Sequence, residues 1–148
     1  MNIFEVKADK KRYLPLLLLA DEQESMIDRY LERGTMYALE EDGGVRAVCV
    51  VTDEGDGTAE LKNLAVEPQF QRRGYGRSMV EFAAQTCRGR FSRLLVGTGD
   101  SPLTIPFYEA CGFTRSHIVP GFFIQHYDHP IFEAGRQLVD MIYLSMEL

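Results

Sequence analysis

The stretch QRRGYGRSM, from Gln71 to Met79, decides the fold because it joins two segments of different periodicity. LKNLAVEP (61–68), just before it, is an apolar run of strand length, whereas MVEFAAQTC (79–87) has helical spacing. The two glycines of the turn would let a ligand approach the backbone without a Cβ in the way. The unpaired N–H groups at the start of the helix, its dipole and three arginines all favour an anion. The turn therefore predicts a polyphosphate site.

Two other nucleotide sites match this turn poorly. A Walker loop needs Lys followed by Ser or Thr after its second glycine, whereas Gly76 is followed by Arg77 and Ser78. A dinucleotide-binding turn needs a third Gly or Ala where this chain has Met79, and it needs an acid about 20 residues further on, near Asp100. The purely structural alternative to a ligand site is that the glycines only let the chain enter the helix and that the arginines are solvated.

The composition bounds the class of protein. A chain of 148 residues with 45% hydrophobic side chains fits one compact domain. Its net charge of −6 argues against a main role in binding nucleic acid or an anionic membrane. No apolar run reaches the length of about 18–20 residues that spans a bilayer, and the first residues do not have the order of a signal peptide. We therefore expect a cytoplasmic protein.

Cysteine and histidine give no sign of a metal site. Cys49, Cys87 and Cys111 are widely spaced within apolar runs, which predicts small buried side chains rather than disulfides or zinc ligands. His126 and His129 form an H-x-x-H pair, but Pro130 follows and no third ligand is evident. We expect a loop there and no metal.

The periodicity along the chain predicts alternating strands and helices. Strands are expected at 2–8, 35–41, 45–51, 59–66, 92–99, 112–119 and 139–148, and helices at 10–20, 22–33, 73–88 and 104–111. The first helix must break or kink at Pro15, and 120–132 is expected to be an irregular aromatic loop. These elements predict a single α/β domain of the α+β type, with a mixed sheet of six to seven strands covered on both faces by about four helices.

The order Gln-x-x-Gly-x-Gly directly after an apolar strand resembles the GNAT superfamily of acyl-CoA-dependent N-acetyltransferases. LKNLAVEPQFQRRGYGRSMVEFA (61–83) is similar to its pyrophosphate-binding motif, and IPFYEACGF (105–113) to the later segment that closes on the pantetheine arm. The resemblance implies one GNAT-like domain over 1–148, acetyl-CoA as cofactor, and direct transfer of the acetyl group to an amine without a cysteine nucleophile.

The same resemblance implies a set of cofactor-binding residues. The backbone of Leu64 and Val66 would hold the pantetheine in a gap between two parallel strands and polarise the thioester. Many members have Asn where this chain has Asp100, and an ionised Asp cannot donate a hydrogen bond, which puts that contact in doubt. The full expected set is Leu64, Ala65, Val66, Gln71, Arg72, Arg73, Gly74, Tyr75, Gly76, Arg77, Ser78, Asp100 and Phe107.

Two residues take catalytic roles by the resemblance. Tyr108 stands at the family's tyrosine and would protonate the departing thiolate, unless it only packs beside Phe107. Glu60 stands where several members carry the base that deprotonates the amine, often through water. A strand-edge glutamate paired with Lys62 is the alternative for Glu60.

The acceptor pocket is expected in the segments to which the family resemblance carries over least, namely the first two helices and the loop 120–132. Its predicted residues are Tyr30, Tyr37, Phe122, Phe123, His126 and Tyr127. This aromatic set suits a small amine, although the loop could instead fold onto its own aromatic cluster or onto a second subunit. A small-molecule amine is the expected acceptor, with a protein or peptide acceptor, or a non-catalytic acyl-CoA-binding module, as alternatives. We expect neither nucleic acid nor membrane as a partner, and a homodimer stays open.

Overall fold

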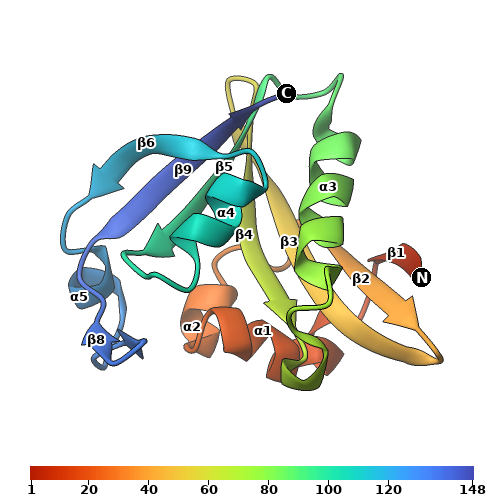
Figure 1. Cartoon of the computed structure of the whole chain (residues 1–148), viewed down its shortest axis with the longest axis horizontal. Helices are drawn as coiled ribbons and strands as arrows, with labels where there is room; N and C mark the ends of the chain where they lie inside the picture. Colours follow the sequence, from red (N-terminus) through yellow and green to blue (C-terminus); the bar gives the residue numbers. More distant parts are fainter.

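The computed structural model describes all residues from 1 to 148 and contains one central seven-stranded sheet (Figure 1). Its strand order is β1-β2-β3-β4-β5-β9-β6, and only β4 and β5 pair in parallel. A separate two-stranded hairpin is formed by β7 and β8. The strands are β1 (Asn2–Val6), β2 (Thr35–Glu41), β3 (Gly44–Gly55), β4 (Thr58–Val66), β5 (Arg93–Gly99), β6 (Thr114–Val119), β7 (Phe132–Glu133), β8 (Arg136–Gln137) and β9 (Met141–Glu147).

Helices cover both faces of the sheet, as expected, although there are five α-helices rather than about four. They are α1 (Leu14–Ala20), α2 (Glu24–Ile27), α3 (Tyr75–Cys87), α4 (Ile105–Ala110) and α5 (Phe122–His126), with 3-10 turns η1 (Lys10–Tyr13) and η2 (Pro68–Phe70). The larger core lies between the sheet and α3 and α4, and the second lies under α1 and α2. None of the helices has the length and apolar character needed to cross a membrane.

The stripe predicted on the third helix packs as expected. Met79, Val80, Ala83 and Cys87 of α3 are all buried against the sheet. Cys49 is also buried, but Cys111 is only half-buried, so the prediction of three buried cysteines is correct for two.

The structure corrects the boundaries of two helices. The expected helix 22–33 is helical only over Glu24–Ile27, and turns continue to Gly34. Buried Lys10 ends this segment, because its Nζ donates to the carbonyls of Leu31 (2.9 Å) and Gly34 (2.8 Å). The expected break at Pro15 is confirmed, since η1 ends at Tyr13 and the proline lies in the first turn of α1.

The expectation of an irregular loop over 120–132 is wrong. The segment contains α5, which begins after Gly121 at φ 68°, and it then enters the β7–β8 hairpin. Phe123, Ile131 and Leu138 form a small core of their own in this region. Figure 1 shows α5 and β8 together near the ends of β6 and β9, away from α3.

The parallel pair opens along its length. Pairing between β4 and β5 runs from Thr58 opposite Arg93 to Leu61 opposite Val96 and then stops, although both strands continue. At the same point the register between β3 and β4 shifts, which leaves Lys62 as an extra residue. The two strands therefore separate after Leu61, and the gap between them lies inside the sheet.

Candidate active site

Two cavities meet at this gap. The first, which we call the turn groove, has a volume of about 530 Å³ and lies along the glycine turn and α4. The second, the central cavity, has a volume of about 320 Å³ and is lined by the separated parts of β4 and β5 together with the α1–α2 connection. Leu64, Thr104, Tyr108 and Glu133 line both cavities. The two cavities therefore adjoin, and these four residues form their junction.

The two glycines of the turn are required for different structural reasons. Gly74 has a φ of 89°, in the left-handed region that favours glycine, and it ends the turn just before α3. Gly76 allows close packing instead, since a Cβ there would lie 3.2 Å from the Phe107 ring of α4. The expected helix start at Arg73 therefore moves to Tyr75. The free N–H groups of the first turn of α3 face a groove that Arg72 and Arg77 also line.

A polar brace fixes this turn to the β2–β3 hairpin. Arg46 Nη1 donates to the Tyr75 hydroxyl (2.6 Å), and that hydroxyl donates to the Glu41 carboxylate. The Arg46 guanidinium also lies 4.0 Å from the centre of the Phe70 ring. The hydrogen bond from Tyr75 lowers the pKa of Glu41. The brace therefore orients the first residue of α3 at the mouth of the turn groove.

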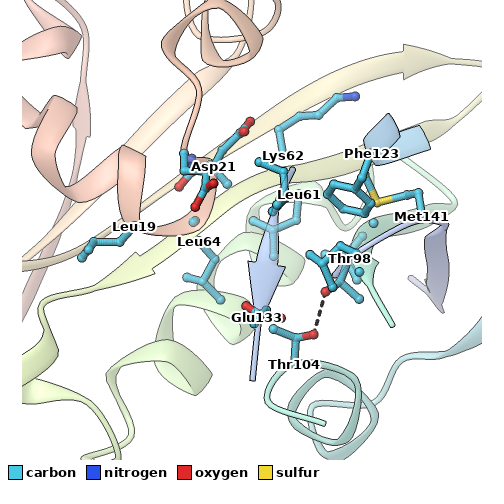
Figure 2. Close-up of a pocket in the computed structure, with 18 of the residues that line it drawn as sticks. Leu19, Asp21, Leu61, Lys62, Leu64, Thr98, Thr104, Phe123, Glu133 and Met141 are labelled. Atoms are coloured by element: carbon cyan, nitrogen blue, oxygen red, sulfur yellow. Dashed lines mark hydrogen bonds between the residues drawn. The ribbon is translucent and has the colours of Figure 1, made fainter. Parts of the chain in front are cut away.

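Backbone groups at the gap are free to bind a ligand. Residues 62–64 of β4 and 97–99 of β5 line the central cavity beyond the last paired residues. Thr98 and Thr104 join through their hydroxyls at 2.6 Å, which connects the end of β5 to the start of α4 (Figure 2). Asn63 is also buried, and its Oδ1 has no hydrogen-bond partner. An extended ligand arm that carries amide groups could form hydrogen bonds with the free backbone groups of residues 62–64 and 97–99.

Tyr108 combines tight packing with a free hydroxyl. Its ring packs against Phe107 and Phe113, with centroids 5.1 and 5.7 Å away. Its hydroxyl forms no hydrogen bond within the chain and is not sealed from the cavities that the residue lines. Burial is the main cause that raises the pKa of Tyr108 well above its usual value. The side chain is therefore a neutral proton donor held at the junction of the two cavities.

Glu60 lies beside the site but lines neither cavity. It stands on the paired part of β4, opposite Leu95, and its Oε2 is 3.2 Å from Lys62 Nζ. Only 7% of the residue is exposed, and this burial raises the pKa of Glu60 although Lys62 opposes the shift. The ion pair with Lys62 matches the structural alternative, but the residue is buried. A base role for Glu60 stays a prediction.

The predicted acceptor residues separate into two groups. Phe123 and Tyr127 line the central cavity, and Tyr30 lies behind it, where its hydroxyl donates to Asp21 (2.9 Å). Tyr37 lies on the other face of the sheet against Phe82, with ring centroids 5.0 Å apart, because β2 turns its side chain toward α3. We therefore leave Tyr37 out of the site.

Phe122 and His126 also lie outside both cavities. They pack on each other with ring centroids 4.5 Å apart, and His126 Nδ1 is 3.4 Å from Arg29 Nη1. The aromatic segment does fold onto its own cluster while it also contributes to the cavity wall.

Four residues of the expected cofactor set line neither cavity. Ala65 turns into the core under α1, and Arg73 lies over the Phe70 ring. The Ser78 amide begins the hydrogen bonding of α3 by donating to Gly74. Asp100 is exposed and is 3.9 Å from Arg136, which agrees with the doubt about its contact. The other nine line the turn groove, namely Leu64, Val66, Gln71, Arg72, Gly74, Tyr75, Gly76, Arg77 and Phe107.

Three contacts, which we call the clasp, join the α1–α2 connection to residues 127–129. The Tyr127 hydroxyl donates to Asp21 Oδ1 (2.6 Å), the Asp128 amide donates to Gln23 Oε1 (2.9 Å), and His129 Nε2 is 3.1 Å from Glu22 Oε1. Burial raises the pKa of Asp21, and the two tyrosine hydroxyls oppose that shift. Hydrogen bonding to Asp128 and Glu22 raises the pKa of His129. The clasp brings together segments more than 100 residues apart in sequence.

Sequence reasoning missed several residues of the site. Asp21, Lys62, Asn63, Thr104 and Glu133 line the central cavity without having been singled out. Asn63 carried a readable signal, since it is a polar residue within an apolar strand. Glu133 also carried a signal, because Ala134 and Gly135 follow it and form a pair suited to a tight turn. Nothing in the sequence signalled Asp21, whose role depends on contacts with distant tyrosines.

A mixed sheet whose parallel pair opens beside a glycine turn at a helix start is the arrangement expected of an acyl-CoA-dependent transferase of the GNAT type. The chain belongs to the GNAT superfamily of N-acetyltransferases, since residues 32–115 match the family model of the acetyltransferase (GNAT) domain. It is 36% identical over 135 residues to the uncharacterized N-acetyltransferase YvbK of Bacillus subtilis (strain 168), covering 90% of this chain and 87% of the relative.

Two further proteins extend the comparison. A GNAT family acetyltransferase from Elizabethkingia anophelis, crystallised with acetyl-CoA bound, superposes with a TM-score of 0.94 at 32% identity and covers 99% of this chain and 97% of its own. The ribosomal protein bS18 alanine N-acetyltransferase of Salmonella typhimurium (strain LT2) is 33% identical over 110 residues, which are 73% of this chain and 60% of the relative. The protein is thus an acetyltransferase that uses acetyl-CoA, which supplies an acetyl group as a thioester.

Proposed function

We propose that the enzyme acetylates an amine of a small-molecule acceptor bound in the central cavity. The clasp carries this proposal, because it holds the α1–α2 connection against residues 127–129 at the cavity wall. The space that remains is about 320 Å³, which suits a small ligand. An extended peptide would need an open path past the same segments.

The turn groove is proposed to hold coenzyme A. Arg72 and Arg77 would neutralise the pyrophosphate, and the amides at the start of α3 would donate to it. Gly76 and Phe107 both line the groove, and a Cβ at Gly76 would lie 3.2 Å from the Phe107 ring. Backbone groups of Leu64 and Val66 beyond the paired part of β4 would hold the pantetheine arm.

The residues at the junction suit direct attack by the acceptor nitrogen. Tyr108 lines both cavities, and its neutral hydroxyl can protonate the sulfur that leaves. Cys49 and Cys87 are buried, and Cys111 lines a separate groove beside α3. No cysteine lies at the junction, which supports transfer without a covalent enzyme intermediate.

The charges of the central cavity favour a cationic acceptor. Asp21, Glu22 and Glu133 line it against a single cation, Lys62. Alkyl amines are protonated at neutral pH, so an acidic wall raises their local concentration.

A screen of acceptors tests the proposal. Thiol release from acetyl-CoA would be measured with monoamines, diamines, amino acids and peptides, and products would be identified by mass spectrometry. We expect the highest kcat/KM with a small amine. Turnover confined to peptides would contradict the proposal.

A second candidate is the N-terminal amine of a protein. The Salmonella relative is named for the alanine of ribosomal protein bS18, so peptides that begin with alanine belong in the screen. A kcat/KM for such a peptide above that of every small amine would favour this candidate.

A further inference from the structure

We infer that the carboxylate of Glu133, on the β7–β8 hairpin, takes the proton from the acceptor amine. This inference rests on the proposed function, in which the acceptor binds in the central cavity and acetyl-CoA in the turn groove. Glu133 lines both the central cavity and the turn groove, together with Tyr108, Leu64 and Thr104. Figure 2 shows its carboxylate in the space between Leu64 of β4 and Thr104. It therefore lies where the acceptor nitrogen must meet the thioester.

The other carboxylates near the site are already engaged or distant. Both oxygens of Asp21 accept tyrosine hydroxyls, and Glu22 pairs with His129. Glu60 pairs with Lys62 and lines neither cavity. Glu133 forms neither an ion pair nor a side-chain hydrogen bond, and it is half-buried. Of the carboxylates that line the central cavity, it alone reaches the junction with the turn groove.

Packing holds Glu133 in this position. The hairpin turns at Ala134 (φ 52°) and Gly135 (φ 76°), so that Glu133 pairs with Arg136. The residues flanking the hairpin, Ile131 and Leu138, are buried in the small core with Phe123. Leu138 lies so close to β5 that a Cβ at Gly99 would be 2.6 Å from it. The hairpin is therefore seated on the end of β5 and cannot shift toward it.

Charged groups of both signs line the two cavities around Glu133. The central cavity contributes the acids Asp21 and Glu22, the cation Lys62 and the neutral Tyr127. From the turn groove, Arg72 and Arg77 oppose the acids, although bound pyrophosphate would offset them. Tyr108 of α4 lies beside it and is neutral.

Glu133 and Tyr108 together account for every proton transferred in the reaction. An alkyl ammonium loses two protons as it becomes an amide. The first passes from nitrogen to the Glu133 carboxylate and then to solvent, which frees the nitrogen lone pair for the new bond to the acyl carbon. The carbon–sulfur bond breaks with its electron pair on sulfur. Tyr108 protonates that sulfur, and the second nitrogen proton restores the hydroxyl.

The test compares three isosteric substitutions with the best acceptor of the screen. Glu133→Gln should lower kcat/KM at neutral pH by about 100-fold or more and remove the contribution of this carboxylate from the acidic limb of its pH profile, so that the remaining limb follows the amine. Activity should partly return at high pH, where the amine is already neutral. Glu60→Gln should keep the acidic limb. Glu109→Gln, an exposed glutamate next to Tyr108 that lines neither cavity, is the matched control for a lost charge.

A second readout does not depend on turnover. Calorimetric titration of the protein with the amine alone, at neutral pH, should show binding weakened about tenfold in Glu133→Gln, because a hydrogen bond to a charged group is lost. The Tm shift with acetyl-CoA should be unchanged, which shows an intact fold and groove. Glu133→Asp should restore part of the rate and of the acidic limb.

A wild-type pH profile in Glu133→Gln, or loss of the carboxylate's contribution to the acidic limb only in Glu60→Gln, would overturn the inference. So would unchanged amine binding. These outcomes are distinct from failure of the proposed function, in which the wild-type enzyme acetylates only peptides. The same three variants can then be assayed on the peptide.

Discussion

Tyr108 combines a packed ring with a hydroxyl that is free for the proposed chemistry. Its ring belongs to the larger core, while its hydroxyl reaches the junction of the two cavities without a protein partner. Burial raises its pKa, so the phenol stays protonated over the whole working pH range. A neutral donor is what a departing thiolate requires.

We therefore predict that Tyr108→Phe lowers kcat by about 10–1,000-fold, the range expected for a lost acid catalyst. The affinity for acetyl-CoA should stay nearly unchanged, because the ring keeps its contacts with Phe107 and Phe113. Single-turnover kinetics would measure the chemical step directly. A normal single-turnover rate would assign Tyr108 to packing alone.

Two opposing effects act on the pKa of Glu60, since burial raises it and the ion pair with Lys62 lowers it. Burial raises its pKa despite the ion pair with Lys62, so the folded state binds this proton more tightly than the unfolded chain does. The stabilising contribution is therefore complete below about pH 4.5, the usual range for Glu, and is lost as the pH rises through the raised value.

Glu60→Gln should remove this pH dependence. We predict that the Tm of the variant, minus that of the wild type, increases as the pH rises from 4 to 7. Thermal melts at several pH values would measure the difference. A constant difference would show that the Lys62 pair cancels the effect of burial, and a difference that falls with pH would show that it outweighs burial.

Among the elements, the β2–β3 hairpin braces the glycine turn before α3. Arg46 reaches across to Tyr75 and the Phe70 ring, and only 13% of its side chain is exposed. Loss of this brace should leave the chemistry intact and loosen the start of α3.

We predict that Arg46→Ala raises KM for acetyl-CoA by about 3–10-fold, as expected for about 1 kcal/mol of hydrogen bonding, with little change in kcat. Arg90→Ala is the control, because Arg90 also stacks on a phenylalanine ring, Phe91, but lies outside the turn groove. Equal effects of the two substitutions would exclude a specific brace.

The elements differ in how far sequence could predict them. Alternating apolar residues and glycine turns located the seven main strands, and the turn before α3 was readable because its conformation depends on local residues. The structure of residues 22–33 and 120–138 was not readable from sequence, because contacts with distant residues shape it. Lys10 caps the end of the first segment, and Leu138 of the second packs against Gly99. For the same reason the turn groove was largely predictable, whereas Asp21 and Glu133 of the central cavity were not.

At the scale of the whole molecule, ligand binding should couple to global stability. The turn groove takes residues from α3, α4 and β4, which pack into the same core. A ligand that needs all three in place binds only the folded chain, and binding therefore shifts the unfolding equilibrium. At a concentration of 100 times Kd the gain is about 2.7 kcal/mol, or several degrees in Tm for a domain of this size.

We predict that acetyl-CoA raises the Tm of the wild-type protein by about this amount, and that Gly74→Glu abolishes the shift. The substitution places a negative charge in the proposed pyrophosphate site, at a residue with φ 89°. Gly89→Glu is the matched control: its φ is 83°, a Cβ there also meets nothing within 4 Å, and it follows the opposite end of α3. Both variants should lose stability from backbone strain, but only Gly89→Glu should keep the response to acetyl-CoA. Loss of the shift in both would mean that strain in α3, rather than charge at the turn, controls binding.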